Sequence, residues 1–460
     1  MKKLLLGIIL SFILIVNINV YAMDNVYSLN ENKDERFNII TNSYNNKHEI
    51  DGIIAAGNYC EEIKNEKDEK QNDYQIMVVK YNKDGKVKWN YTYGKTSEDV
   101  LDYITYSYDE ELNIDGYLIV LKNTYDINEP NEEKDSLSTI IKIGLDGKQV
   151  WEKNANINKK EKIKKIIPTT NNEEKNDGYV GIGTINDDTA LIVKYDRELN
   201  VVWAKDFKNQ DYEVTSYDDI TNIYEDNKVV GYAVIRRQEN IKQNKNKQTD
   251  IIRYDNDGNE IKNIDNTINK YDSVNLQASD NGFIIYGKTS DLKLKKGTTS
   301  FYIIKYSSND TEEWETIGDV LLDKEGKVVV NPIIDENKIT GYHLLCTNKK
   351  ESSTYVIKID AEGNIKKKIK KITNEYYDIE DFSIYKDVIY FVGQIVCPED
   401  DNCEYDTNSL FLVSDEDKVI EVKDNQSANV LIFITVFIVG CIGISLVRKR
   451  KKMNQSSFFL

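Results

Sequence analysis

Five cysteines and two histidines carry most of the reactive chemistry that the sequence offers. Cys397 and Cys403 flank a short loop and could form a disulfide outside the cytoplasm, or remain two thiols in a reducing habitat. We expect Cys60 and Cys346 to be unpaired, although a disulfide between Cys60 and Cys403 is an alternative. Cys441 lies in a hydrophobic run and is expected to pack there. Because the chain has no Cys-x-x-Cys pair and no Cys beside a His, the cysteines do not predict a metal site.

The histidines do not predict hydrolysis. His48 lies in a polar loop and His343 in a predicted strand, and nothing near either resembles a Ser-His-Asp or Cys-His arrangement. We therefore expect no catalytic residues and no cofactor.

Two acidic segments raise the question of calcium. Residues 255–260 read Asp-Asn-Asp-Gly-Asn-Glu, but they lack the spacing and the bidentate Glu of an EF-hand. They also occupy a position where other repeats have a hairpin turn, so a turn is the stronger interpretation. A denser cluster, Asp400, Asp401, Glu404 and Asp406, is better explained as a solvated loop, and no metal site is predicted.

The charge balance excludes one class of partner. The chain has 78 acidic and 61 basic residues and a formal charge of −17, whereas nucleic acid is bound by clustered cations. The acidic residues gather in short loops, and the simpler interpretation is that these loops only keep the surface soluble. The alternative hypothesis is that they form a rim that binds a basic partner or divalent cations. The residues proposed for partner binding are Asp109, Glu110, Glu111, Glu173 and Glu174.

The two ends of the sequence predict an envelope location. Residues 1–22 resemble a secretory signal peptide, with two lysines, an apolar run and a cleavage site after Ala22. Residues 428–447 contain an 18-residue apolar run long enough to span a bilayer, and residues 448–460 begin with five basic residues that predict a cytoplasmic tail. Residues 23–427 would then form an ectodomain outside the cytoplasm.

Self-comparison of the predicted ectodomain finds seven repeats. Each begins with a strand led by a polar residue and Gly, and a second strand and a tight turn follow. The first strands start at residues 51, 115, 177, 231, 282 and 341, with a degenerate copy at 388. All four tryptophans fall at one position of the third strand, namely Trp89, Trp151, Trp203 and Trp314. Many of the 31 tyrosines also recur at strand positions, which favours a structural role over carbohydrate stacking.

This combination resembles bacterial extracytoplasmic β-propeller repeats of the quinoprotein type, in which Trp follows a turn Gly by four residues. Gly85 to Trp89 and Gly147 to Trp151 have that spacing. The resemblance implies an all-β, seven-bladed propeller. Blades four and six depart from the pattern, because Lys262 and Lys367 stand where Trp is expected. Quinone-dependent enzymes of this type have a paired-Cys site, and this chain has no adjacent cysteines.

The ends of the repeat region predict how the ring closes. The seventh unit has strands near 388–393, 410–413 and 419–422 but no fourth strand before the apolar run. We expect residues 37–41 to supply it from the N-terminal side, since closure removes exposed strand edges.

The sequence therefore predicts a membrane-anchored, non-enzymatic platform for a protein or glycan partner at the cell surface. An envelope enzyme such as a quinone-dependent oxidoreductase, or an envelope assembly factor, is the alternative. Because the last predicted strand ends near Val422, we expect the long inserts at 61–73, 122–138 and 236–249 to lie toward the membrane. The acidic loops would then face outward.

Overall fold

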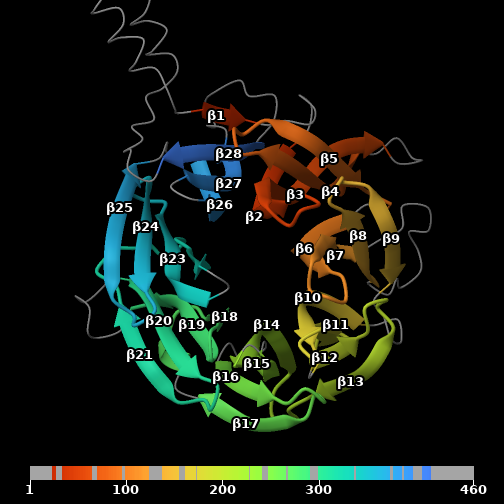
Figure 1. Cartoon of the computed structure of the whole chain (residues 1–460), viewed down its shortest axis with the longest axis vertical. Coiled ribbons are helices and arrows are strands. Elements are labelled where there is room, and N and C mark those ends of the chain that lie inside the picture. Colours follow the sequence, from red (N-terminus) through yellow and green to blue (C-terminus); the bar gives the residue numbers. More distant parts are fainter. Residues whose placement is uncertain are drawn as a thin grey trace, which may run out of the picture. The chain divides into compact units, whose positions relative to one another are not determined.

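The computed structural model describes residues 23–26 and 34–415. The gaps in the second range are 65–69, 96–98, 124–136, 155–160, 172, 227, 241–246, 266–267, 291–298, 336–337, 373–376, 386–387 and 397–406. Within these residues, strands form seven four-stranded antiparallel sheets arranged as blades around a central axis (Figure 1). The chain thus contains a seven-bladed β-propeller, as the repeats predict.

The first three blades follow chain order from the innermost to the outermost strand. Blade 1 comprises β2 (Asp34–Tyr44), β3 (Ile50–Lys64), β4 (Lys70–Asn82) and β5 (Val87–Tyr93). Blade 2 comprises β6 (Asp99–Tyr108), β7 (Ile114–Asn123), β8 (Leu137–Gly144) and β9 (Gln149–Asn154). Blade 3 comprises β10 (Glu161–Thr170), β11 (Asn176–Ile185), β12 (Thr189–Tyr195) and β13 (Val201–Phe207).

The next three blades have the same order. Blade 4 comprises β14 (Val214–Glu225), β15 (Lys228–Glu239), β16 (Lys247–Tyr254) and β17 (Glu260–Asp265), and the short helix η2 (Ile268–Lys270) follows it. Blade 5 comprises β18 (Asn275–Ser279), β19 (Gly282–Thr289), β20 (Ser300–Ser307) and β21 (Glu312–Ile317). Blade 6 comprises β22 (Val328–Asp335), β23 (Lys338–Asn348), β24 (Ser353–Asp360) and β25 (Ile365–Ile372).

Blade 7 is built from both ends of the described chain. Its inner strands are β26 (Tyr377–Tyr385), β27 (Val388–Val396) and β28 (Thr407–Asp415), and its outermost strand is β1 (Met23–Val26). β1 pairs antiparallel with β28, with Met23 opposite Val413 and Val26 opposite Leu410. An N-terminal strand therefore closes the ring, as predicted, but the strand is 23–26 and not 37–41.

The predicted order of strands within a blade is shifted by one position. Residues 37–41 lie in β2, which is the innermost strand of blade 1. Residues 100–104 and 328–330, which follow the third strand of a repeat in the sequence, likewise begin the next blade as parts of β6 and β22. The strand expected at 419–422 lies outside the described residues.

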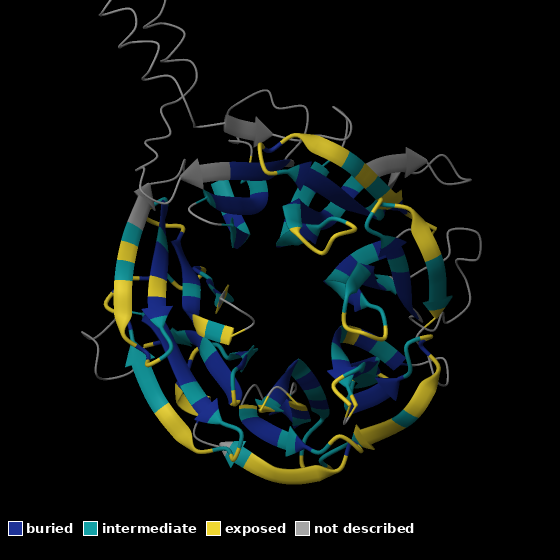
Figure 2. Ribbon diagram, viewed as in Figure 1, coloured by how far each residue is buried: buried dark blue, intermediate teal, exposed yellow. Residues whose placement is uncertain are grey.

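Burial follows the position of each strand in its blade. The inner three strands carry most of the buried side chains, whereas the outermost strands are largely exposed (Figure 2). The recurring tyrosines are part of this core, since Tyr81, Tyr117, Tyr195 and Tyr254 are at most 3 % exposed. Their structural role, favoured from the repeat pattern, is confirmed.

Hairpin turns of one kind join the third and fourth strands. In blade 4 the Asp255 carboxylate accepts hydrogen bonds from the backbone N–H groups of Asp257 (3.0 Å) and Asn259 (2.7 Å), and Gly258 has a φ of 76°. A side-chain acceptor at the first position and a left-handed residue at the fourth define a type I turn with a following bulge. The hairpin interpretation of residues 255–260 is therefore confirmed.

The tryptophans join neighbouring blades through these turns. The indole N–H of Trp89 in blade 1 donates to the carbonyl of Leu145 in the blade 2 turn (3.2 Å). Trp314 in blade 5 likewise donates to Ala361 in the blade 6 turn (2.9 Å). Each ring packs where the turn residue has no side chain, because a Cβ on Gly147 would lie 2.5 Å from the Trp89 ring.

Blade 4 has no Trp at this position, and a salt bridge to blade 5 replaces the indole contact. Lys262 stands at the Trp position, and its Nζ lies 2.9 Å from a carboxylate oxygen of Asp310 in the blade 5 turn. Arg253 on the adjacent strand contacts the other oxygen at 2.9 Å. The Asp310 side chain is only 2 % exposed, so a buried carboxylate joins these two blades instead of an indole.

We predict that Asp310→Asn will destabilise the ring by about 2–4 kcal/mol, because it leaves the largely buried Arg253 without its counter-charge. Asn tolerates the left-handed φ of 65° at this position, so the turn itself is preserved. Lys262→Ala is the matched control and should cost less than about 1 kcal/mol, because Lys262 is half-exposed. Urea unfolding gives the free energy of unfolding of each variant. Equal losses of stability in Asp310→Asn and Lys262→Ala would contradict this prediction.

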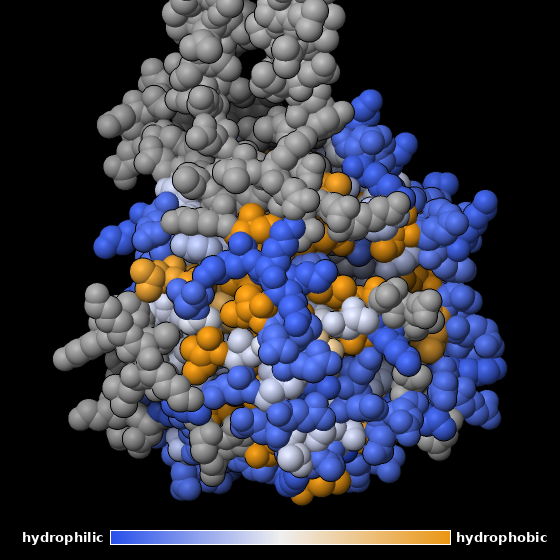
Figure 3. Space-filling view, turned by 60° about the vertical axis from the view of Figure 1, so that its left-hand side comes forward, coloured by the Kyte–Doolittle hydropathy of each residue, from blue (hydrophilic) through white to orange (hydrophobic). Residues whose placement is uncertain are grey.

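The outside of the ring is largely hydrophilic. Figure 3 shows hydrophobic residues among hydrophilic ones on the side it views. The outermost strand β25 has the sequence Ile-Lys-Lys-Lys-Ile-Lys-Lys-Ile, and lysines on an edge strand oppose pairing with another chain.

The predictions for the two ends of the sequence lie beyond this ring. No helix in the described part of the chain is long and apolar enough to span a bilayer. The predicted signal peptide (1–22), membrane span (428–447) and tail (448–460) are outside the described residues.

Candidate binding site

The alternation of strand direction gives the ring two faces. We call one face the turn face. It carries, in each blade, the turn between the first and second strands and the turn between the third and fourth strands. The opposite face, with the connections between second and third strands and between blades, is the insert face. The acidic loops and the long inserts lie on opposite faces, as predicted, because the former join first to second strands and the latter join second to third strands.

The acidic residues proposed for partner binding lie on the turn face in two neighbouring turns. Asp109, Glu110 and Glu111 are in the β6–β7 turn, and Glu173 and Glu174 are in the β10–β11 turn. The Asp109 carboxylate accepts from the backbone N–H of Asn113 (2.9 Å). Although desolvation opposes it, hydrogen bonding to Asn113 lowers the pKa of Asp109. Asp109 therefore shapes its turn.

Cations of the next blade interleave with the other acids. Lys175 in blade 3 lies 2.9 Å from Glu111 and 3.5 Å from Glu110, and Arg197 lies 3.6 Å from Glu110. The two turns are also joined by a backbone bond from Asn176 to Glu110 (3.0 Å). The sequence identified the acids but not these counter-charges, which moderate the negative potential of the predicted rim. Partner binding by these five residues stays a prediction.

Both chain ends of the ring lie at the turn face. β28 is the third strand of blade 7, so it runs toward the turn face and ends there at Asp415, and β1 begins there at Met23. The sequence predicts that the chain leaves the ring on the side of the inserts. The last described strand, β28, instead ends at the turn face. The basis for placing the acidic loops on the outward face is therefore lost.

At the centre of the ring, charged side chains of the innermost strands join blades to one another. Lys165 of β10 contacts Asp219 of β14 at 2.6 Å, and Asp219 also accepts from the backbone N–H of Leu276 in β18 (2.8 Å). Although burial opposes protonation, Asp219 raises the pKa of Lys165. Asp381 of β26 plays a similar part, since it accepts from the N–H of Ile40 in β2 (3.0 Å).

We predict that the ring loses stability as the pH rises from about 4 to 7. Burial raises the pKa of Asp381 to about 7 and that of Asp102 to about 6, above the usual value of 3.8. In this range the two carboxyl groups hold more protons in the folded chain than in the unfolded chain. Together they outweigh buried His343, whose lowered pKa has the opposite effect, so raising the pH favours unfolding. Asp381→Asn should flatten the slope of melting temperature against pH, and an unchanged slope would contradict this assignment.

A charged cluster joins blades 6, 7 and 1 toward the insert face. Glu380, whose side chain is 7 % exposed, contacts both Arg36 of β2 and Lys327, which precedes β22. Burial lowers the pKa of Lys327 to about 8. Two residues earlier on β26, Asp378 lies 2.8 Å from Lys349 and accepts from Gln394 (3.1 Å).

A pocket of about 200 Å³ adjoins this cluster on the insert face between blades 6 and 7. Its lining comes from the end of β23, the β23–β24 turn, the starts of β24 and β26, and the end of β27. The residues are Thr347, Asn348, Lys349, Ser352, Ser353, Thr354, Tyr377, Asp378, Ile379 and Val396. The β23–β24 turn is tied to the connection that precedes β22, because Asn348 donates to Leu321 (3.0 Å) and Lys350 donates to Asp323 (2.6 Å). The blade 6 wall of the pocket is therefore preformed.

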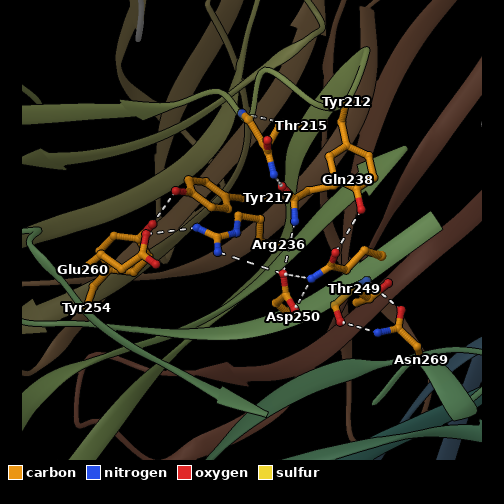
Figure 4. Close-up of polar contacts among 12 residues, drawn as sticks. Tyr212, Thr215, Tyr217, Arg236, Gln238, Thr249, Asp250, Tyr254, Glu260 and Asn269 are labelled. Atoms are coloured by element: carbon orange, nitrogen blue, oxygen red, sulfur yellow. Dashed lines mark hydrogen bonds and ion pairs between the residues drawn. The ribbon is translucent and has the colours of Figure 1, made fainter. Parts of the chain in front are cut away.

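A second polar network lies within blade 4 and serves packing (Figure 4). Arg236 contacts Glu260 at 2.9 Å and Asp250 at 3.9 Å, and its guanidinium lies 4.2 Å from the centre of the Phe207 ring in blade 3. Gln238 donates to Asp250 (3.1 Å). Since Arg236 is 7 % and Asp250 1 % exposed, this network joins blades 3 and 4 and presents little surface to a ligand.

The remaining candidate residues lie apart from one another. Cys60 and Cys346 are free thiols, the latter buried, whereas Cys397 and Cys403 lie outside the described residues. His48 is in the β2–β3 turn and His343 in β23, where burial lowers its pKa to about 4. Among the described side chains, no group of three or more His, Cys, Asp or Glu could hold a metal ion.

Sequence reasoning missed both the charged cluster and the pocket. One signal was present, since Asp378, Glu380 and Asp381 place three acids in one innermost strand of a buried fold. Such acids need partners, and Lys327 and Lys349 lie more than 25 residues away in the preceding blade.

Comparisons with known proteins identify no family for this chain. No protein-family model matches the chain, and no curated protein matches it. Solved structures with detectable similarity include the β-propeller domain of Vanderwaltozyma polyspora Nup133, at 10 % identity and a TM-score of 0.37 over 74 % of this chain and 89 % of that one. A protein from Lactobacillus plantarum has 10 % identity and a TM-score of 0.41 over 85 % and 97 %. An α-L-arabinofuranosidase from Fusarium graminearum has 11 % identity and a TM-score of 0.40 over 71 % and 99 %. These values carry no conclusion about activity or partners.

Proposed function

We propose that this chain is a non-catalytic binding platform of the cell envelope. Residues 1–22 direct the ring out of the cytoplasm, and residues 428–447 anchor it with residues 448–460 inside. The insert face points away from the membrane and recognises a protein or glycan partner.

One observation carries the choice of face. Met23 and Asp415, the two chain ends of the ring, lie at the turn face, while the pocket lies at the insert face. On this proposal the chain passes from Asp415 toward the membrane span, which leaves the insert face toward the exterior. A rigid surface loses little conformational freedom on binding, which favours recognition.

Capture from native membranes tests the proposal. The full chain, tagged after Leu460, is cross-linked in cells and purified, and the proteins and glycans that it retains are quantified. Val396→Trp fills the pocket mouth from a side chain that is 40 % exposed. We expect it to reduce capture of the main partner at least fivefold.

A turn-face variant supplies the contrast. Glu110→Gln, Glu111→Gln, Glu173→Gln and Glu174→Gln together remove four of the five acids proposed from the sequence and should leave capture unchanged. Asp109 is kept because its carboxylate shapes the turn. Loss of the partner in this variant, with Val396→Trp unaffected, would return recognition to the acidic turns.

A further inference from the structure

We infer that the pocket between blades 6 and 7 binds a single sugar residue of an envelope glycan. This inference rests on the proposed function, because it names the ligand class for the same face.

The polar wall offers donors and acceptors without net charge. Thr347, Ser352, Ser353 and Thr354 bring hydroxyl groups, and the single cation, Lys349, is balanced by Asp378 at 2.8 Å. A charged ligand gains little from such a wall, because one member of the ion pair attracts it and the other repels it. A neutral ligand with many hydroxyl groups can both donate and accept there.

One buried hydroxyl in this wall lacks a partner. Ser353 is 2 % exposed, and its Oγ makes no hydrogen bond within the described residues. A buried polar atom without a hydrogen bond costs free energy, which a ligand hydroxyl could recover once the Ser353 side chain turns toward the pocket.

The remaining wall and the size of the pocket fit a sugar ring. Tyr377, Ile379 and Val396 supply carbon surface for the C–H groups of a pyranose. At about 200 Å³ the volume lies below the range of roughly 300–1,000 Å³ that drug-sized ligands occupy. The pocket therefore has room for one ring, and the rest of a glycan would extend into solvent.

Saturation-transfer NMR on the purified full chain tests the inference directly. The chain is kept in a detergent without a sugar headgroup, and the probes are D-glucose, D-galactose and N-acetyl-D-glucosamine. Glycine and methyl phosphate, which both carry observable C–H protons, are the comparisons. We expect saturation transfer to at least one sugar and none to glycine or methyl phosphate.

Two variants and one control locate the site. Val396→Trp should weaken sugar binding at least tenfold, and Lys349→Gln, which retains most of the side-chain length, about fivefold. Val150→Trp is the matched control, because Val150 is 59 % exposed on β9 in blade 2, whereas the pocket is lined by blades 6 and 7. Binding to this variant should equal that of the wild type. The melting temperatures of the tryptophan variants verify folding, and Lys349→Gln keeps the test decisive if Val396→Trp unfolds.

Three results would overturn the inference. They are transfer to none of the sugars, sugar transfer that neither pocket variant alters, and preferential transfer to glycine, which would indicate a zwitterion that separates Lys349 from Asp378. Because the probes act on purified protein, the result is independent of where the chain resides. A chain that captures an envelope partner but binds no sugar keeps the proposed function and loses only this inference.

Discussion

Gly147→Ala is expected to destabilise the ring by about 3 kcal/mol, far more than an ordinary turn substitution. Two costs combine at this position. Gly147 has a φ of 80°, which strains any residue with a Cβ, and the added Cβ would lie 2.5 Å from the ring of Trp89. The indole must therefore move, and its hydrogen bond to Leu145 is lost.

A double-mutant cycle with Trp89→Ala separates these two costs. When the indole is absent, Gly147→Ala should cost only the backbone strain, roughly 1–2 kcal/mol. Urea denaturation of the four proteins gives the coupling free energy. Additive effects of the two substitutions would show that Gly147 serves its own turn and not the packing of blade 1 against blade 2.

Removal of residues 24–26 is the second change with a large expected effect. These residues form most of β1, and without them β28 becomes an exposed edge whose Leu410 and Phe411 are fully buried in the intact ring. Four residue pairs join β1 to β28. We therefore expect the deletion to lower the free energy of unfolding by about 2–4 kcal/mol and to increase association between molecules.

Triple substitution of residues 24–26 by alanine is the control for the deletion. It retains the backbone that pairs with β28, so it should restore most of the lost stability. Thermal unfolding and light scattering measure both effects. If the deletion melts like the intact chain, closure by β1 contributes nothing to the ring.

The number of blades could be predicted from the sequence, but the blade boundaries could not. The Gly-led strand recurs six times, with a degenerate seventh copy at 388, and the Trp position recurs four times. Both patterns correspond to strands in the structure. A repeat of four strands has the same period whichever strand is counted first, so the pattern alone does not locate the innermost strand. The innermost strands also vary in chemistry, with Lys165, Asp219 and Asp381 at corresponding places, and they lack the Gly-aromatic signal.

The candidate site depended on contacts that the sequence does not contain. Glu110 and Glu111 were recognised as acidic, but Lys175 becomes their partner only when blades 2 and 3 meet. The pocket likewise needs β23 and β24 of one blade beside β26 and β27 of the next. The predicted recognition face followed from the direction of a last strand at 419–422. In the structure β1 takes the outermost place in blade 7, and the last described strand, β28, runs the opposite way and ends at the turn face.

A protease cleavage site inserted after residue 130 gives the most direct test of the central claim, that the ring lies outside the cell with its insert face accessible. This position is in the connection between β7 and β8 on the insert face. In intact cells, added protease should cut the inserted site completely while an epitope after Leu460 stays intact and membrane-bound. Protection of the inserted site until the cells are lysed, or digestion of the epitope from outside, would contradict the account.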